Sequence, residues 1–239
     1  MTILTASTTN EASVRPVLRL GLLGVGNVGQ GVIDVLTRNG GEIERRAGQA
    51  IRVVAASRRN VAALKALADA GVRTTDDPGA VVRDPEVDVV VELIGGTTLA
   101  KQLVLEAISL GKHVVTANKA LLAEHGTEIF AAAQKAGVIV AFEAAVAGGI
   151  PIIKALREGL TANHIEWVAG IINGTTNFIL SEMRDKGLDF DTVLKEAQRL
   201  GYAEADPTFD IEGVDAAHKL ALISAIAFGV PVQFHKAHV

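Results

Sequence analysis

The sequence lacks cysteine altogether and has few aromatic residues. With no cysteine among its 239 residues, disulfides and thiolate metal ligands are excluded, and the composition fits a reducing compartment such as the cytoplasm. Aromatic residues account for only 4%, whereas hydrophobic residues as a whole reach 49%, so the apolar content is mainly aliphatic. This bias is typical of α/β proteins whose parallel strands are buried on both faces.

Charge and hydropathy argue against two further classes of protein. The formal net charge is -4 and residues of both signs are interspersed, so no broad basic face is predicted and nucleic acid is not an expected partner. No apolar run reaches the roughly 18 residues of a membrane span. Residues 1–16 are rich in Thr, Ser and Ala and lack the basic start and apolar core of a secretory signal, so we expect a flexible tail.

The first clear motif is a glycine turn that follows the apolar run 17–23. Glycines at three positions, Gly24, Gly26 and Gly29, would supply a tight turn, close approach of the backbone to a pyrophosphate, and close packing of helix on strand. Asn27 and Val28 open the helical pattern, and the amides of a helix N-terminus favour an anion. The pattern predicts a dinucleotide site, with a purely structural glycine turn as the alternative.

A second strand, predicted over 51–56, informs the choice of cofactor. Sites that prefer NAD usually carry Asp or Glu at the end of this strand, whereas here Arg58 and Arg59 follow Ser57. Guanidinium groups bind phosphate oxygens in a bidentate manner, so the pair favours the 2′-phosphate of NADP(H), with NAD(H) also possible. A solvated pair of loop arginines is the alternative.

Further βα units extend the pattern to about residue 150. Nearly apolar strands end at two polar turns, which place Thr97 and Lys119 at the carboxyl edge of the sheet, where open α/β folds bind ligands. We therefore predict a doubly wound parallel sheet over residues 17–150 and a separate substrate half over 151–239. The latter includes a predicted strand at 165–172, which alternates in part between apolar and polar residues.

A loop of small residues begins at Glu143 and ends at Pro151. It offers one carboxylate and several carbonyl groups, and hard cations prefer such oxygen ligands. A bound Na⁺ or K⁺ is therefore a hypothesis, although one carboxylate does not define such a site. The polar turn 173–177 similarly presents backbone N–H groups that suit an anion.

The stretch 201–219 combines five carboxylates, a histidine and a lysine before an apolar helical run. Asp215 and Lys219 are four residues apart and share one face of the predicted helix. Because Lys219 lies where the helix becomes apolar, partial desolvation would suit it to proton transfer, with Asp215 holding it in position. The alternative is an ordinary surface ion pair.

Five motifs together resemble homoserine dehydrogenase, in the family's order and at plausible spacing. They lie at 24–29, 116–119, 143–151, 173–177 and 201–219, and the resemblance covers about residues 17–230. It implies a Rossmann-type domain followed by an α+β substrate and dimerisation domain, and it implies a homodimer. The implied activity is the NAD(P)-dependent interconversion of L-homoserine and L-aspartate 4-semialdehyde, on the way to threonine and methionine.

The resemblance also implies roles for individual residues. Lys219 matches the proton donor, supported by Asp215, and Lys119 matches the lysine near the reacting hydroxyl and the nicotinamide. Glu204 matches the carboxylate that binds the homoserine ammonium, and Asp210 a second polar contact. The pocket would further include Gly174, Thr175, Thr176 and Tyr202. The family's monovalent cation would bind main-chain oxygens of Glu143, Val146, Gly148 and Ile150.

One departure from the family leaves alternatives open. Family members continue well past the position of Val239, so we expect the substrate domain to be incomplete in this chain. Another NADP-linked oxidoreductase with a two-domain plan is one alternative. A catalytically silent fragment, which binds dinucleotide or assembles with other chains, is a second.

Overall fold

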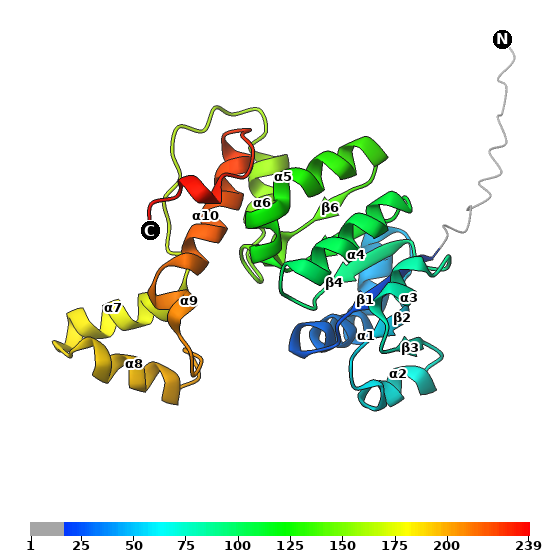
Figure 1. Ribbon diagram of the computed structural model, residues 1–239, viewed down its shortest axis with the longest axis horizontal. Helices are drawn as coiled ribbons and strands as arrows, with labels where there is room; N and C mark the ends of the chain where they lie inside the picture. Colours follow the sequence, from blue (N-terminus) through cyan, green and yellow to red (C-terminus); the bar gives the residue numbers. More distant parts are fainter. Residues whose placement is uncertain (1–16) are drawn as a thin grey trace, which may run out of the picture.

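The computed structural model describes residues 17–239, so the tail predicted for residues 1–16 lies outside the described residues (Figure 1). The first part of the chain alternates strands with helices, as the sequence predicts. These elements are β1 (Leu18–Leu23), α1 (Asn27–Ala47), β2 (Ile51–Ser57), a 3₁₀ turn (Val61–Leu64), α2 (Lys65–Asp69), β3 (Arg73–Thr75), α3 (Pro78–Arg83), β4 (Val89–Glu92), α4 (Thr98–Ser109), β5 (His113–Thr116), α5 (Lys119–Ala136) and β6 (Val140–Ala141).

The strands form one parallel sheet of six in the order β3-β2-β1-β4-β5-β6. The order reverses between β1 and β4, the point at which open α/β sheets leave a crevice for ligands. Leu23 pairs with Glu92 and Glu92 with Thr116, so the carboxyl ends of the three central strands lie in line. The predicted Rossmann-type, doubly wound class is confirmed.

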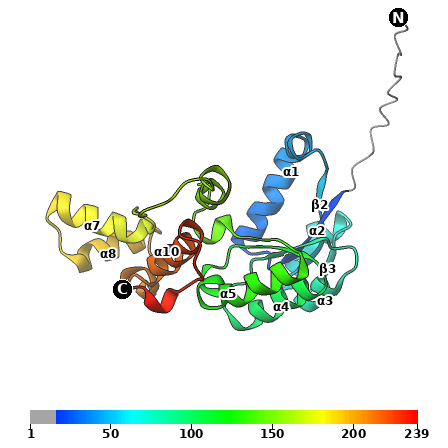
Figure 2. The same ribbon diagram turned by 90° about the horizontal axis from the view of Figure 1, so that it is seen from above.

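Helices cover both faces of this sheet (Figure 2). Leu20 and Leu22 of β1 pack with side chains of α1 and α2 on one face. On the other face, a larger cluster joins Leu23 and Val90 to α3, α4 and α5. Gly21 faces this second layer, where a Cβ atom would lie only 2.6 Å from a methyl group of Val81. The absent side chain therefore lets α3 approach β1 closely.

The second part of the chain is helical in its regular elements. They are α6 (Ile152–Lys154), a π-helical turn (Ala155–Gly159), α7 (Gly174–Lys186), α8 (Phe190–Arg199), α9 (Thr208–Ile211), α10 (Val214–Ala227) and a 3₁₀ turn (Phe234–Lys236). α10 packs against α5, and its residues Leu222 and Ile223 join the main core. The α7–α8 hairpin projects away from the sheet and has a small core of its own (Figures 1 and 2). The boundary near residue 150 stays a prediction.

The strand predicted over 165–172 is wrong. That segment has no regular secondary structure, and Trp167 and Ile171 are 73% and 76% exposed. A strand takes its hydrogen bonds from a neighbouring strand, and within residues 17–239 none pairs with this segment. The alternation of apolar and polar residues showed only that this segment is able to pair with another strand. As a separate finding, no helix of the described chain combines the length and apolar character needed to span a membrane.

Candidate active site

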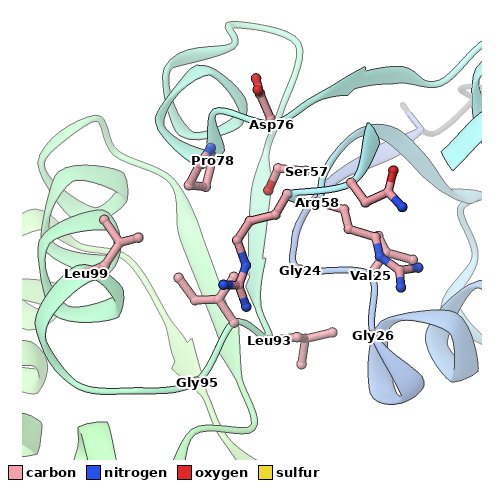
Figure 3. A pocket seen from close by; sticks show the side chains of 13 residues that line it. Gly24, Val25, Gly26, Ser57, Arg58, Asp76, Pro78, Leu93, Gly95 and Leu99 are labelled. Atoms are coloured by element: carbon pink, nitrogen blue, oxygen red, sulfur yellow. The ribbon is translucent and has the colours of Figure 1, made fainter. Parts of the chain in front are cut away.

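A cleft of about 700 Å³ opens at the carboxyl ends of β1, β2 and β4 (Figure 3). We call it the glycine cleft. Four predicted cofactor residues line it, namely Gly24, Gly26, Arg58 and Arg59. The position is the crevice at which the strand order reverses, so the cleft lies where the sequence places the dinucleotide.

The three glycines of the turn meet the geometric demands predicted for them. Gly24 has a φ of +92°, a conformation that side chains other than hydrogen rarely adopt. A Cβ atom on Gly29 would lie 2.5 Å from the carbonyl oxygen of Gly24, so this position requires glycine. Gly26 instead faces open space, and among residues 17–239 no side chain caps the N-terminus of α1. The first amides of α1 are therefore available to a pyrophosphate.

The two arginines form a basic wall of the glycine cleft. Arg58 directly follows β2 and lies across the cleft from Pro78 and Leu99 (Figure 3). Its backbone N–H donates to the carbonyl of Thr75, which fixes the start of the loop. An arginine wall opposite an apolar one suits the phosphate and the adenine of NADP, respectively. Asn27, Gly29 and Thr97 are also predicted cofactor residues. They lie within three positions of Gly26 or Gly95 in the sequence but do not line the cleft.

A second, smaller pocket of about 250 Å³ shares Leu93 and Gly95 with the glycine cleft. Lys119 and Val28, both predicted cofactor residues, line it, so we call it the Lys119 pocket. Phe209 of α9 forms its far wall, with the Lys119 Nζ atom 5.9 Å from the ring centroid. Sequence reasoning did not predict this contribution from α9.

Glu92 anchors the two turns around the Lys119 pocket. Its carboxylate is fully buried and accepts hydrogen bonds from Thr116 Oγ1 at 2.6 Å and from the amides of Ile94 and Gly95. Thr116 Oγ1 in turn accepts from the amide of Asn118 at 3.0 Å. Sequence reasoning missed Glu92, although a carboxylate inside an otherwise apolar strand was a visible signal.

Asn118 completes this support of the Lys119 pocket. Its Oδ1 atom accepts from the Leu121 amide at 3.1 Å and so caps α5, while its Nδ2 group donates to the Gly96 carbonyl at 2.7 Å. The turn that follows β4 is thereby tied to the turn that follows β5. Lys119 is the first residue of α5, so its backbone is held at both sides.

A third pocket, of about 710 Å³, lies between α7 and α10. We call it the α7 pocket. Its lining includes the predicted substrate and catalytic residues Gly174, Thr175, Tyr202, Asp210, Asp215 and Lys219.

Two of the hydroxyl groups predicted to contact the substrate already have partners within the protein, and one of the predicted carboxylates lies outside the α7 pocket. Thr175 Oγ1 donates to the Tyr202 carbonyl at 2.6 Å and so ties the 201–207 loop to α7. Thr176 directs its hydroxyl to Asn173 at 2.9 Å. Glu204 is exposed and lines none of the three pockets described above, and its carbonyl accepts from Gln198 Nε2 at 3.1 Å.

Asp215 joins the Lys119 pocket to the α7 pocket. Its side chain is only 5% exposed, with Oδ1 lying 3.0 Å from Lys119 Nζ and Oδ2 lying 2.7 Å from Lys219 Nζ. Lys219 also donates to the carbonyl of Ile172 at 3.0 Å. The alternative of a surface pair is excluded by this burial. The sequence placed Asp215 with Lys219, and the structure adds Lys119 on the opposite oxygen.

Local electrostatics keep Asp215 charged. Burial raises the pKa of Asp215, but hydrogen bonds from Lys219, Asn173 and Lys119 outweigh it and hold the pKa below its usual range. His218, a buried residue of α10 three positions after Asp215, has a pKa below its usual value because burial disfavours its charged form. It packs between Phe209 and Phe234, and its buried Nδ1 atom has no hydrogen-bond partner in the described part of the chain.

The loop predicted to hold a cation is tied to α6 through the Glu143 side chain. Both carboxylate oxygens of Glu143 accept from the start of α6, from the amides of Ile153 at 2.7 Å and Lys154 at 3.0 Å. The carbonyl of Glu143 accepts the backbone amides of Val146 and Ala147, and that of Ile150 accepts the amide of Ile152. A carbonyl oxygen has two lone pairs, so Ile150 keeps one lone pair for a cation, whereas both of Glu143 are already used. The set that includes Val146 and Gly148 stays a prediction.

Side-chain metal ligands do not gather elsewhere in the described chain. Within residues 17–239, no group of three or more His, Asp or Glu side chains is arranged to hold a metal ion. Together, the glycine turn, the cleft at the switch point and the adjoining lysine pair define an NAD(P)-binding protein of the Rossmann class.

Comparison with known proteins makes this class specific. Residues 24–143 match the family model described as "Homoserine dehydrogenase, NAD binding domain", and residues 151–239 match "Homoserine dehydrogenase". The homoserine dehydrogenase of Pseudomonas aeruginosa is 63% identical over 228 residues, which cover 94% of this chain and 51% of the relative. That of Bacillus subtilis is 41% identical over 222 residues and is likewise covered to 51%.

Solved structures give the same result. A homoserine dehydrogenase from Thiobacillus denitrificans is 69% identical with a TM-score of 0.88, over 93% of this chain and 52% of that one. A putative homoserine dehydrogenase from Archaeoglobus fulgidus is 34% identical with a TM-score of 0.80, and 72% of its length is covered. This chain belongs to the homoserine dehydrogenase family. It spans about half the length of the curated relatives it matches.

Proposed function

We propose that this chain catalyses the NAD(P)H-dependent interconversion of L-aspartate 4-semialdehyde and L-homoserine. The observation that carries the proposal is the Asp215 carboxylate, which binds Lys119 of the Lys119 pocket and Lys219 of the α7 pocket. A cofactor in the glycine cleft would extend into the Lys119 pocket, because the two share Leu93 and Gly95. A substrate in the α7 pocket would approach from the other side.

In the reductive direction, a dinucleotide bound in the glycine cleft would supply a hydride to the aldehyde carbon. The electron pair of the C=O π bond then moves to oxygen, which takes one proton to become the hydroxyl of homoserine. Lys219 is suited to give that proton, because two of the three ammonium protons are engaged by Asp215 and Ile172 and the third remains for the substrate. Lys119 stabilises the developing negative charge on oxygen.

Asp215 has two functions in this arrangement. Its ionised carboxylate keeps both lysines oriented, and its negative charge balances their positive charges. Of the two carboxylates predicted to contact the substrate, Glu204 for its ammonium and Asp210 as a second polar contact, Asp210 is the better placed, because it lines the α7 pocket and Glu204 does not. Gly174, Thr175 and Tyr202 form the remaining wall of this site, and Thr176 supports it from within α7.

The preferred cofactor in this proposal is NADP(H), with NAD(H) as the alternative. Two observations support it: Arg58 and Arg59 line the glycine cleft where an NAD site would carry an acidic residue, and a hyperthermophilic archaeal homoserine dehydrogenase was solved in complex with NADPH. That relative is 26% identical with a TM-score of 0.77. The monovalent cation, the homodimer, the cytoplasmic location and the division near residue 150 stay predictions alongside it.

Steady-state oxidation of NADPH in the presence of aspartate semialdehyde tests the proposal. Loss of a general acid reduces rates by about 10²- to 10⁴-fold, so we expect a loss of that size in Lys219→Ala. Lys195→Ala, which changes an exposed lysine of α8, is the matched control and keeps the wild-type rate. Dinucleotide binding without turnover would favour the silent fragment. Turnover of other aldehydes alone would favour a different NADP-linked oxidoreductase.

A further inference from the structure

Asn173 lies at the junction of two acidic side chains. The residue is 7% exposed, and its Nδ2 group donates to Asp210 Oδ1 at 2.7 Å and to Asp215 Oδ2 at 2.9 Å. Its Oδ1 atom accepts from the amide of Thr176 at 2.8 Å and from the Thr176 hydroxyl at 2.9 Å. Both donors and both lone pairs of this amide are therefore used.

The Asn173 amide lies where it can reduce the repulsion between two carboxylates. Asp210 of α9 and Asp215 of α10 approach the same nitrogen atom, and two carboxylates so close together repel each other. The Asn173 amide group supplies one N–H to each of them, which offsets part of this repulsion. An acceptor in its place would leave three oxygen-bearing groups facing one another without a proton between them.

We propose that Asn173 is a positioning residue, which fixes Asp215 between the two lysines and Asp210 at the wall of the α7 pocket. The inference rests on the proposed function, because Asn173 acts through the group that orients the proton donor. Asp215 faces the Asn173 amide and four titratable groups. These are Lys119 from α5, Lys219 and His218 from α10, and Asp210 from α9.

A merely structural role for Asn173 is the competing explanation, because its Oδ1 atom also caps α7. The chain contains a matched cap without any contact to the site. Asp189 caps α8 by the same spacing, accepting from the Thr192 amide at 3.0 Å and from the Thr192 hydroxyl at 2.7 Å. Serine and aspartate are both good N-caps, so Asn173→Ser and Asn173→Asp keep the capping acceptor and lose both amide N–H donors; the one hydroxyl donor of serine lies on a shorter side chain.

The test measures the titration of the Asp215 and Asp210 carboxyl carbons by ¹³C NMR in the full chain, together with the kinetics of NADPH oxidation by aspartate semialdehyde. In Asn173→Ser we expect the midpoint of Asp215 to move to higher pH. We expect kcat to fall at least tenfold while the KM for NADPH stays within about twofold, since the amide hydrogen bond to the charged carboxylate of Asp215 is lost. In Asn173→Asp we expect a larger fall in kcat, because a third carboxylate is added beside Asp210 and Asp215.

The control and the titration keep the outcomes separable. Asp189→Ser keeps the wild-type midpoint of Asp215 and the wild-type kcat, whatever its effect on thermal stability. An unchanged Asp215 midpoint in Asn173→Ser would overturn the inference, as would wild-type kcat in Asn173→Asp. If the wild-type chain shows no turnover, the proposed function fails, while the NMR titration still decides the role of Asn173.

Discussion

Replacement of Asp215 by asparagine is the perturbation whose effect the structure defines best. The change preserves the shape of the side chain and removes the only charge that faces both Lys119 and Lys219 within the described site. It also turns an N–H₂ group toward a donor, either an ammonium or the Asn173 amide. Both lysines would then lose their counter-ion in a partly buried setting.

The size of the effect follows from distance and burial. At an effective dielectric constant of about 20, a charge pair near 3 Å attracts by roughly 5 kcal/mol before desolvation is subtracted. Removal of one partner from a buried pair typically costs about 3 to 5 kcal/mol. Because the Lys119 side chain is 34% exposed and that of Lys219 is 19% exposed, we expect the lower figure, about 3 kcal/mol.

Urea and thermal unfolding measure this loss at neutral pH, where about 3 kcal/mol corresponds to a fall in Tm of about 6 to 12 °C for a chain of this size. Asp69→Asn is the matched control: Asp69 pairs with Lys65 at 2.8 Å four residues away, but their side chains are 64% and 77% exposed. Such surface pairs contribute less than about 1 kcal/mol.

The pH dependence gives a second check. The pKa of Asp215 is lowered in the folded chain, so its stabilisation is present above the ordinary carboxyl value of about 3.9 and is lost as the pH falls through the folded value. The difference between wild type and Asp215→Asn should therefore narrow below about pH 4. A loss at pH 7 no larger than that of Asp69→Asn would refute the reasoning.

Three further predictions concern the glycine cleft and α10. Arg58→Asp raises the KM for NADPH at least tenfold and leaves that for NADH nearly unchanged, since a phosphate contact is lost; steady-state kinetics with both cofactors measure it. Gly29→Val abolishes NADPH binding in a fluorescence titration, because its side chain would collide with the Gly24 carbonyl. His218→Phe removes the fall in unfolding free energy that wild type shows below about pH 6.5: burial lowers the pKa of His218, so protons bind preferentially to the unfolded chain.

A different experimental result would contradict each of these three predictions. An unchanged ratio of the two KM values in Arg58→Asp would contradict the preference for NADP(H). Gly31→Val is the control for Gly29→Val, because Gly31 lies on the same helix and a Cβ atom there meets open space. Equal loss of NADPH binding in both variants would contradict the packing argument. Equal wild-type stability at about pH 7 and about pH 5.5 would contradict burial of neutral His218.

Local signals were enough to predict the first part of the fold. Glycine spacing and the change from strand-like to helix-like periodicity are properties of neighbouring residues, and they indicated the turn at Gly24 and the parallel sheet. The pairing of Asp215 with Lys219 was likewise predictable, because helical geometry fixes residues four positions apart. The strand over 165–172 was wrong because its pairing depends on a partner strand, which its own sequence does not specify.

Contacts between distant residues could not be predicted from the residues alone. Lys119 reaches Asp215 from a different helix, and only the family resemblance brought both to one site. Phe209 and Asn173 were missed for the same reason, since their roles depend on how α9 and α7 pack against the rest. Glu204 shows the reverse case: the resemblance assigned it to the substrate, yet its side chain lies outside the α7 pocket.

The most direct test of the central claim is the kcat for aspartate semialdehyde reduction in Lys119→Ala, Lys219→Ala and the double variant. If Asp215 joins the two lysines into one centre, the second substitution adds less than about tenfold to the loss caused by the first, because residues that act as a unit are not additive. Independent losses that multiply in the double variant would contradict a shared centre at Asp215.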